Sequence, residues 1–293
     1  MPSSRIALLQ SSGRPGDPAK NLEIVAGAAR DAAAGGAGLL VCPEMFLTGY
    51  AIGADVSRLA EPADGPAAEA VARIADEHGI AVLYGYPERA GDGARLHNSA
   101  RLIGPDGSPL ADYRKTHLFG GYEQEWFTPG DTPVVQAELG GLRVGILICY
   151  DVEFPENVRA HALAGTDLLL VPTAQMHPFQ FVAESVVPVR AFENQMYVAY
   201  VNRTGPEGEG PAAFEFVGLS CLAGPDGTTR ARAGTRRGVG DSRDGDGAVS
   251  AASRTGRGGG RADTGCRRGR PAAARGRRRR TAAPRRVPPA PVW

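Results

Sequence analysis

Short aliphatic runs recur along residues 1–229 and alternate with stretches of helical periodicity, and this alternation restricts the possible folds more than any other feature. The runs expected to form strands are RIALLQ (5–10), GLLVCPEM (38–45), IAVLYGYPER (80–89), GLRVGILICYD (141–151), DLLLVPTA (167–174), MYVAYVNRTG (196–205) and FVGLSCLAGPDG (216–227). The helices expected between them cover 21–37, 65–79, 155–165 and 181–196. Short apolar runs separated by helical segments indicate an α/β fold.

The strands do not alternate strictly with helices. The stretch HNSARLIGPDGSPLADYRK (97–115) has the pattern of a hairpin around the turn PDG. We therefore expect antiparallel pairs beside parallel ones. Two sheets packed face to face with helices outside, an α-β-β-α sandwich of four layers, satisfy this order. A doubly wound parallel sheet is the alternative.

The character of the chain changes after Thr229. Residues 230–293 contain 18 arginines, no lysine and 4 aspartates, which leaves 15 of the 33 basic and 28 of the 32 acidic residues in 1–229. The back of the chain is rich in Arg, Gly, Ala and Pro and has few aliphatic residues, so it cannot bury enough apolar area to offset the entropy of ordering. We expect a folded domain at 1–235 and a disordered tail at 236–293.

Two interpretations of the tail are open. Arginine without lysine is what GC-rich codons give when they are read out of frame, so 236–293 is interpreted as a frameshift product. Taken as native sequence, RGRRRR and RTGRGGGR would bind nucleic acid or another polyanion through phosphate contacts. That binding would be nonspecific, since no aromatic residues interleave the arginines. An Arg-rich polyanion-binding protein is therefore the alternative from another functional class.

Cysteine usage and the N-terminus predict a cytoplasmic protein. The four cysteines have neither CxxC pairing nor a zinc-ligand spacing, and MPSSRIALLQ has no long apolar segment. No apolar run approaches the roughly 18 residues that suggest a membrane span. We expect no metal, no organic cofactor and no membrane partner.

Three segments end apolar strands on groups that are costly to bury alone. They are LLVCPEMFLTGY with Glu44, LADYRKTHLF with Lys115 and GILICYDVEF with Cys149. If the strands are neighbours, the carboxylate could take the thiol proton and the ammonium could stabilise the thiolate and an oxyanion. Each residue alone is more simply a loop carboxylate, a surface ammonium or a core thiol, but their joint occurrence favours catalysis.

The segments PEMFLTGY, YRKTHLF and CYDVEFPE resemble the three signature segments of the nitrilase superfamily of carbon–nitrogen hydrolases, and the resemblance spans about residues 4–235. It implies the α-β-β-α sandwich, a homodimer or larger assembly that the aberrant tail could impair, and an amide-cleaving enzyme without a cofactor. It also implies Glu44 as general base, Lys115 as oxyanion stabiliser and Cys149 as nucleophile. A second family glutamate that positions substrate matches Glu123 best, with Glu125 as competitor.

Within the superfamily, LLVCPEMFLTGYAIG, VLYGYPER and RAFENQMYVAYVN are most similar to 5-aminopentanamidases of lysine catabolism. This similarity implies hydrolysis of 5-aminopentanamide to 5-aminopentanoate and ammonia. Glu153 stands where many relatives outside that branch have Arg, and we expect it to favour a substrate that ends in an ammonium unless it pairs with an arginine. Tyr50 and Tyr150 are expected beside the substrate. An N-carbamoyl amine hydrolase, a general aliphatic amidase and a nitrilase are the alternatives.

Overall fold

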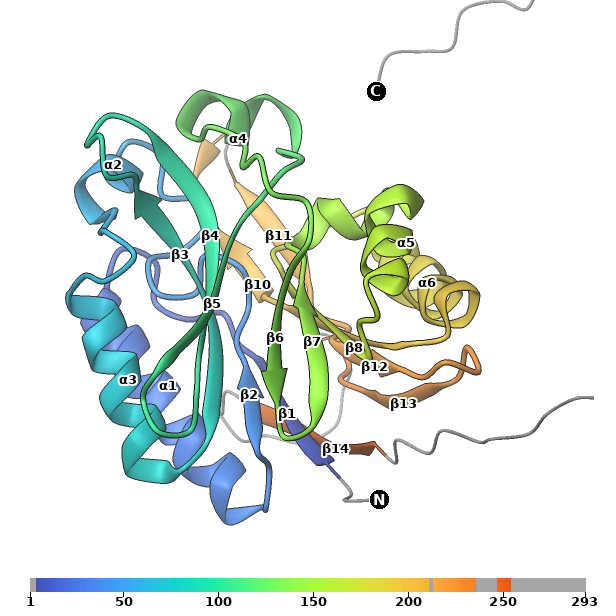
Figure 1. Ribbon diagram of the computed structural model, residues 1–293. Helices are drawn as coiled ribbons and strands as arrows, with labels where there is room; N and C mark the ends of the chain where they lie inside the picture. The colour runs from blue at the N-terminus through green and yellow to red at the C-terminus, as the bar shows by residue number, and fades with distance from the viewer. Residues whose placement is uncertain (1–3, 211–212, 236–246, 254–293) are drawn as a thin grey trace, which may run out of the picture. The chain divides into compact units, whose positions relative to one another are not determined.

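Two six-stranded sheets form the centre of the computed structural model, which describes residues 4–210, 213–235 and 247–253 (Figure 1). The first sheet contains, in spatial order, Gly247–Ser253 (β14), Ser4–Gln10 (β1), Leu39–Val41 (β2), Ala81–Arg89 (β3), Leu96–Ile103 (β4) and Pro109–Arg114 (β5). The second contains Thr229–Arg232 (β13), Cys221–Ala223 (β12), Tyr197–Asn202 (β9), Leu168–Thr173 (β8), Leu142–Ile146 (β7) and Val135–Leu139 (β6). A separate ribbon pairs Thr204–Glu207 (β10) with Phe214–Val217 (β11).

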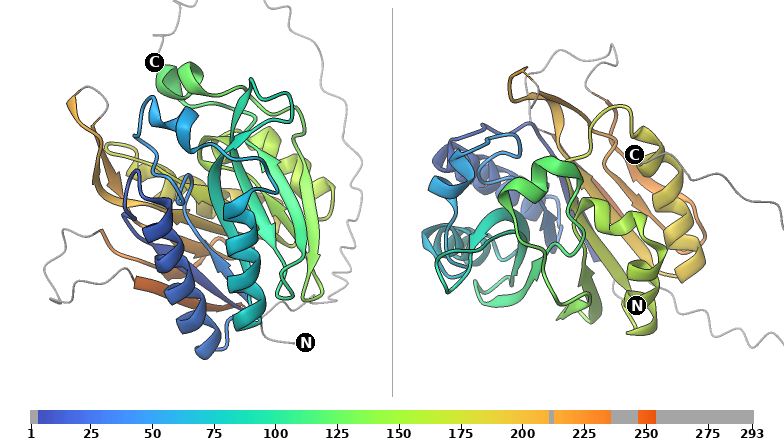
Figure 2. Two further views of the ribbon diagram at one scale, coloured as in Figure 1. Left: turned by 90° about the vertical axis from the view of Figure 1, so that its left-hand side faces the viewer. Right: turned by 90° about the horizontal axis from the view of Figure 1, so that it is seen from above.

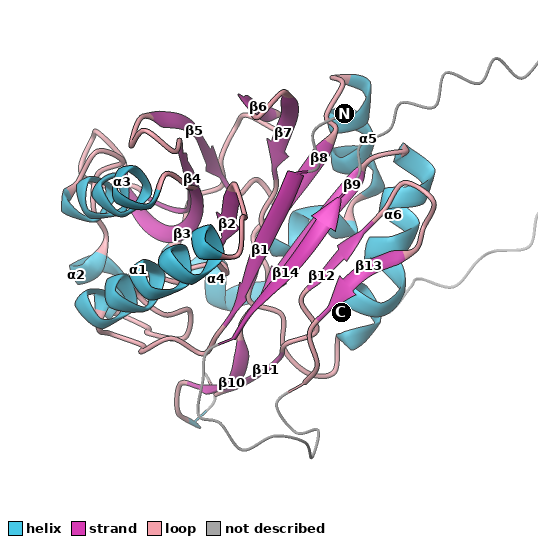
Figure 3. Ribbon diagram, turned by 90° about the horizontal axis from the view of Figure 1, so that it is seen from below, coloured by secondary structure: helices cyan, strands magenta, loops and turns pink. Residues whose placement is uncertain are grey.

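Helices cover the outer face of each sheet (Figures 2 and 3). Pro18–Ala34 (α1) and Pro66–His78 (α3) lie on the first sheet, and Pro155–Leu163 (α5) and Val187–Asn194 (α6) on the second. The shorter helical segments are Asp55–Leu59 (α2), Gly120–Trp126 (α4), the 3₁₀ turn Cys149–Glu153 and the π-helical turn Val182–Val186. None of the helices in the described ranges has both the length and the apolar composition needed to cross a bilayer.

The predicted α-β-β-α sandwich is confirmed, and the alternative of a single doubly wound sheet is wrong. Strand β1 shows how the layers arise from a period of two. Its residues Ile6 and Leu8 are buried in the core between the two sheets. Ala7 and Leu9 point to the opposite face and pack in a second core with Val25 of α1. Both faces of this strand are therefore apolar, and the strand reads as a continuous aliphatic run.

Parallel and antiparallel pairs both occur, as expected. Strands β1, β2 and β3 are parallel neighbours, and so are β7, β8 and β9. The hairpin predicted at 97–115 is formed by β4 and β5, with Ala100 opposite Tyr113. Gly107 in its turn has a φ of 75°, a conformation that glycine adopts without a steric cost.

Strand β14 lies beyond residue 235, the expected end of the folded domain. Its backbone pairs antiparallel with β1, from Ser4 opposite Ser253 to Gln10 opposite Gly247. The stretch GAVSAAS lacks the long aliphatic run used to recognise strands, but the open edge of β1 offers it hydrogen-bond partners along its whole length. The disorder and polyanion binding predicted for 236–246 and 254–293 lie outside the described residues.

Candidate active site

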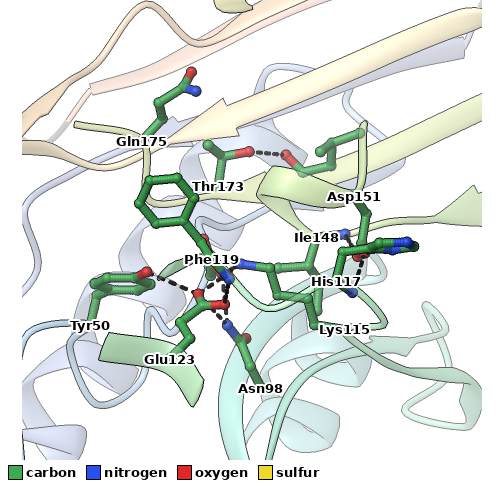
Figure 4. A network of polar contacts seen from close by, with 12 residues as sticks. Tyr50, Asn98, Lys115, His117, Phe119, Glu123, Ile148, Asp151, Thr173 and Gln175 are labelled. Carbon is green, nitrogen blue, oxygen red and sulfur yellow. Dashed lines mark hydrogen bonds and ion pairs between the residues drawn. The ribbon is translucent and has the colours of Figure 1, made fainter. Parts of the chain in front are cut away.

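Three buried charged side chains meet where the ends of β2 and β5 approach α4, and Figure 4 labels two of them, Lys115 and Glu123. The Nζ atom of Lys115 donates to Glu44 Oε1 at 2.8 Å and to Glu123 Oε1 at 2.7 Å. All three side chains are fully buried. Asn98 on β4 donates its Nδ2 to the same two oxygens, at 2.7 Å to Glu44 and 3.3 Å to Glu123. An ammonium and an amide are thus clamped between two carboxylates.

The loop that carries Glu44 passes very close to β3. Gly85 makes this approach possible, because a Cβ on it would lie 2.5 Å from the backbone nitrogen of Met45 and 2.9 Å from the Cα of Glu44. Met45 itself has a φ of 51°, which is uncommon for a residue with a side chain. Lys115 continues the pairing of the hairpin beyond β5, since its backbone N–H donates to the carbonyl of Asn98 at 2.8 Å.

Glu123 and Glu125 were the two candidates for the second glutamate. The structure brings Glu123 into the cluster and leaves Glu125 exposed on α4. Each oxygen of Glu123 has a partner beyond Lys115. Its Oε1 accepts from the hydroxyl of Tyr50 at 2.9 Å, and its Oε2 accepts from the backbone N–H of Phe119 at 2.7 Å. Tyr50, predicted to border the substrate, is therefore tied to the charged cluster.

Cys149 begins the 3₁₀ turn that follows β7, with a φ of 47°. It lines a small cavity of about 10 Å³ together with Tyr50, Phe119, Glu153, Ala174, Gln175, Met176 and Phe179. Burial raises the pKa of its thiol, and the charge of Glu44 raises it further, whereas Lys115 opposes the shift. The sulfur therefore holds its proton until a base removes it.

The pKa values of Glu44 and Lys115 are shifted in directions that suit a base and a neighbouring cation. Burial raises the pKa of Glu44 to about 7, against the opposing charge of Lys115. Burial lowers the pKa of Lys115, but the charges of Glu123 and Glu44 outweigh it and keep the group well above its ordinary value. Lys115 is therefore an ammonium at neutral pH, while Glu44 exchanges its proton there.

Asp151 connects the turn of Cys149 to the segment after Lys115. Its carboxylate accepts from the backbone N–H groups of Ile148 at 3.1 Å and His117 at 2.9 Å (Figure 4). It also accepts from the hydroxyls of Tyr113 at 2.9 Å and Thr116 at 3.0 Å. These bonds use both oxygens of a fully buried carboxylate. The thiol and the ammonium are thereby held on one rigid support.

Glu153, at the other end of the turn, is half-buried and lines the cavity. Its Oε1 accepts from Gln175 Nε2 at 3.3 Å. The guanidinium of Arg190 donates to the backbone carbonyl of Glu153 at 2.7 Å and to the carboxylate of Glu193 at 3.0 Å. Burial raises the pKa of Glu153, and the charges of Lys115 and Arg190 oppose that shift.

We expected Tyr150 beside the substrate. The ring of Tyr150 packs edge-on against Phe119 and Phe154, and Tyr150 is absent from the residues that line the cavity around Cys149. Asn98 and Gln175 were missed, because an amide inside an apolar strand or after one has no local signal. Within the described ranges, no group of three or more His, Cys, Asp or Glu side chains is arranged to hold a metal ion.

A larger cavity of about 410 Å³ lies at the opposite ends of β2 and β8 from this cluster, between the two sheets. Its lining is mainly apolar, with Ile6, Leu39, Val144 and Leu168, and Arg5 supplies its charge. It contains no thiol, carboxylate or imidazole, so we assign the chemistry to the smaller cavity at Cys149.

Comparison with known proteins agrees with this geometry. The sequence model of the carbon–nitrogen hydrolase family matches residues 5–240. The chain is 49% identical over 231 residues to the protein named "hydrolase in pqqF 5'region" of Pseudomonas protegens, covering 78% of this chain and 79% of that one. It is 38% identical to an (R)-stereoselective amidase of a Pseudomonas species, with coverage of 78% and 81%.

Solved structures give the same result. An amidase from Nesterenkonia sp. AN1 in complex with butyramide is 34% identical, with a TM-score of 0.77 over 85% of this chain and 90% of that one. Another structure of that amidase, with the same identity, TM-score and coverage, has the acetamide moiety of fluoroacetamide covalently added at its active-site cysteine. The chain therefore belongs to the carbon–nitrogen hydrolase family of the nitrilase superfamily and is a hydrolase of non-peptide C–N bonds.

Proposed function

We propose that the protein hydrolyses a small linear aliphatic amide through a thioester on Cys149. One observation carries this proposal: the buried carboxylate of Glu44, whose charge acts on the buried thiol of Cys149, has one oxygen without a hydrogen-bond partner among the described residues. Glu44 Oε1 is occupied by Lys115 and Asn98, whereas Oε2 has no hydrogen-bond partner among the described residues. An unpartnered buried carboxylate oxygen is a strong proton acceptor.

In the proposed reaction, Glu44 removes the thiol proton while the sulfur of Cys149 attacks the amide carbonyl. The resulting oxyanion is stabilised by the Lys115 ammonium. Glu44 passes its proton to the departing nitrogen, ammonia leaves, and the acyl group remains on sulfur as a thioester. Glu44 then takes a proton from water as the water attacks the thioester, and the acid and the free thiol are released. Glu123 holds Lys115 in place throughout.

For the substrate, we propose an amide whose far end carries an ammonium, with 5-aminopentanamide as the best candidate. Glu153 supports this choice, because its carboxylate lines the cavity at Cys149 and its recorded hydrogen bond comes from the neutral amide of Gln175. A carboxylate in partly desolvated surroundings attracts an ammonium more strongly than one in water. A role in lysine degradation is part of the same proposal, because it requires that 5-aminopentanamide be the substrate.

The substrate proposal is tested with 5-aminopentanamide and pentanamide, which differ only at the far end. We expect kcat/KM to favour the charged amide by on the order of tenfold, the effect of about 1.4 kcal/mol. Glu153→Gln should abolish that preference. Glu156→Gln, which removes an exposed carboxylate three residues later, should keep it. Equal values for both amides in the wild type and in Glu153→Gln would refute the role of Glu153.

The alternatives within the family differ in the bond that is cleaved. Ammonia release from a panel of amides, N-carbamoyl amines and nitriles separates an amidase from an N-carbamoyl amine hydrolase and a nitrilase. Cys149→Ala is the control, since it leaves the fold but removes the nucleophile. Hydrolysis of carbamoyl compounds alone, or of nitriles alone, would replace the amide proposal.

We also propose that the protein self-associates through the helical layer of the second sheet. Leu163 on α5 is 81% exposed, and Val189 and Phe192 on α6 are 51% and 57% exposed. These apolar side chains lie on two neighbouring helices, and a second copy of the same face would cover them. Sedimentation velocity should show a dimer or larger species for the wild type and for Ala34→Asp on α1, but a monomer for Phe192→Asp.

The arginine-rich stretch 254–293 supports a proposal of polyanion binding, which is separate from amide hydrolysis. If 254–293 binds polyanions, binding to a DNA duplex should weaken steeply with salt and vanish when 254–293 is deleted. The deletion starts there because β13 and β14 belong to the second and first sheets. Retained binding after the deletion would exclude the tail as its source.

A further inference from the structure

Arg203 and Glu207 form a buried ion pair that the proposed reaction does not use. Arg203 follows β9, Glu207 ends β10, and Arg203 Nη2 lies 2.5 Å from Glu207 Oε2. The exposed fractions of the two side chains are 0% and 2%. Removing two charges from water is costly, and such a pair is retained where its geometry and further hydrogen bonds offset that cost. The further hydrogen bonds of this pair therefore indicate what it holds.

Four of those bonds go to one loop, residues 44–51. Glu207 Oε1 accepts from the backbone N–H groups of Tyr50 at 2.5 Å and Ala51 at 2.8 Å. Arg203 Nη1 faces the carbonyls of Glu44 at 3.5 Å and Met45 at 3.4 Å. The carboxylate therefore holds the end of the loop and the guanidinium holds its beginning, with the two connected by their own salt bridge.

Both ends of this loop carry groups of the site. Glu44 bonds to Lys115 at the beginning, and Tyr50 bonds to Glu123 at the end. The loop is packed tightly against the pair: Gly49 has a φ of 96°, and a Cβ on it would lie 2.9 Å from Glu207 Oε1. A further bond connects the pair to the segment that follows β1, because Arg203 Nη2 donates to the carbonyl of Ser12 at 2.7 Å.

We propose that Arg203 and Glu207 are positioning residues for amide hydrolysis, which hold the loop 44–51 so that Glu44 and Tyr50 stay in the charged cluster. The inference rests on the proposed function, in which Glu44 is the base. Hydrogen bonds from a guanidinium and to a carboxylate are shorter and stronger than neutral ones, which suits a support for a strained loop. The ribbon β10–β11 thereby acts on the chemistry without contributing a group to the cavity.

The expected effect of loosening the loop follows from what surrounds Glu44. Lys115, Glu123, Cys149 and Tyr50 are the charged and titratable groups that face it. Burial is the main reason for its raised pKa, so a looser loop that admits water should lower that value. The pH at which Glu44 becomes able to accept the thiol proton should then fall.

The test uses the full chain and needs no substrate. Iodoacetamide alkylates the thiolate, and the rate at Cys149 is followed by peptide mass as a function of pH; Cys42 and Cys221 are fully buried. Glu207→Gln and Arg203→Lys should both move the midpoint of this pH profile of alkylation to lower pH. Asp112→Asn, which disrupts the Arg101–Asp112 pair on β4 and β5, is the matched control and should leave the midpoint unchanged.

Amide hydrolysis supplies a second readout. Glu207→Gln should lower kcat by on the order of 10- to 100-fold with little change in KM, since misplacement affects proton transfer more than binding. Arg203→Lys keeps the charge but loses the planar fork, so its loss should be smaller. If Glu207→Gln does not fold, the alkylation midpoint of Arg203→Lys tests the inference instead. Wild-type midpoints in the folded variants, or an equal shift in Asp112→Asn, would overturn the inference.

The two proposals fail separately. A wild-type protein that releases no ammonia from any amide would refute the proposed function, while the alkylation midpoint would still report whether the ion pair sets the environment of Glu44. Normal amide hydrolysis with unshifted midpoints would refute the positioning role alone.

Discussion

At the residue scale, the two oxygens of Glu44 have different surroundings, and the proposed reaction depends on this difference. Lys115 and Asn98 orient the carboxylate through Oε1, and Oε2 remains available for a proton. Burial brings the pKa to about 7. A base whose pKa lies near the working pH combines a useful fraction of the deprotonated form with a sufficient driving force for proton transfer.

The pH dependence of the reaction follows from that pKa. Above about 7 Glu44 is a carboxylate and can accept the thiol proton, whereas below it Glu44 is protonated and inactive. We expect kcat/KM to fall about tenfold for each pH unit below that midpoint, as for a single titrating base. Initial rates across the acid range measure this limb. A profile that stays flat down to the ordinary glutamate value, about 4.3, would contradict the assignment.

Glu44→Gln keeps the size of the side chain and an oxygen for Lys115 but cannot take a proton. We expect kcat to fall by on the order of 10²- to 10⁴-fold, the usual contribution of a general base. Glu125→Gln, on the exposed side of α4, is the control and should have wild-type kinetics. Circular dichroism of both variants checks that the fold is retained.

The sequence predicted the catalytic candidates at this scale because each lies in a short stretch of characteristic neighbours. Glu44, Lys115 and Cys149 end apolar runs, and their polar chemistry stands out against the strands that precede them. Asn98 lies inside a strand and is surrounded by ordinary residues. Its contact with two carboxylates depends on β4 lying beside β5 and facing the loop after β2, which no local pattern encodes.

At the scale of elements, the site depends on how closely the loop after β2 can approach β3. Gly85 is the point of contact, and the space for a Cβ is occupied by the backbone of residues 43–45. Backbone atoms cannot rotate away as a flexible side chain can. A substitution at this position must therefore displace either β3 or the loop with Glu44.

Gly85→Ala should lower amidase activity strongly and destabilise the protein by about 1–3 kcal/mol, the usual cost of overpacking. Gly91→Ala is the matched control, because a Cβ there meets no atom within 4 Å. Urea unfolding gives the stability change, and active-site titration of Cys149 gives the fraction of competent sites. Wild-type activity in Gly85→Ala would show that the loop has room to shift.

At the scale of the whole molecule, β14 closes the edge of the first sheet. Without it, β1 would present unpaired backbone groups along its length, and an exposed edge of this kind pairs readily with other chains. The expected boundary at residue 235 would leave that edge open. We therefore propose that the folded unit extends through residue 253.

Two truncations test this proposal. A chain that ends after residue 253 keeps β14 and should remain active and free of aggregates, whereas a chain that ends after residue 235 should aggregate. Light scattering during heating, together with size-exclusion chromatography, measures the difference. Equal behaviour of the two chains would show that the pairing of β14 with β1 does not protect the edge.

The sequence by itself determined the α/β class and the sandwich order, and it predicted Glu44, Lys115 and Cys149 as site residues, because strand periodicity and motif chemistry are local properties. Tertiary structure alone decided the rest. The bonds of Arg203 and Glu207 to the loop 44–51 join residues more than 150 positions apart, and β14 pairs with a strand at the other end of the chain. Such contacts exist only after both sheets have assembled. The backbone N–H and C=O groups involved have no partner nearby in the sequence, so their hydrogen bonds form with groups that the fold brings close.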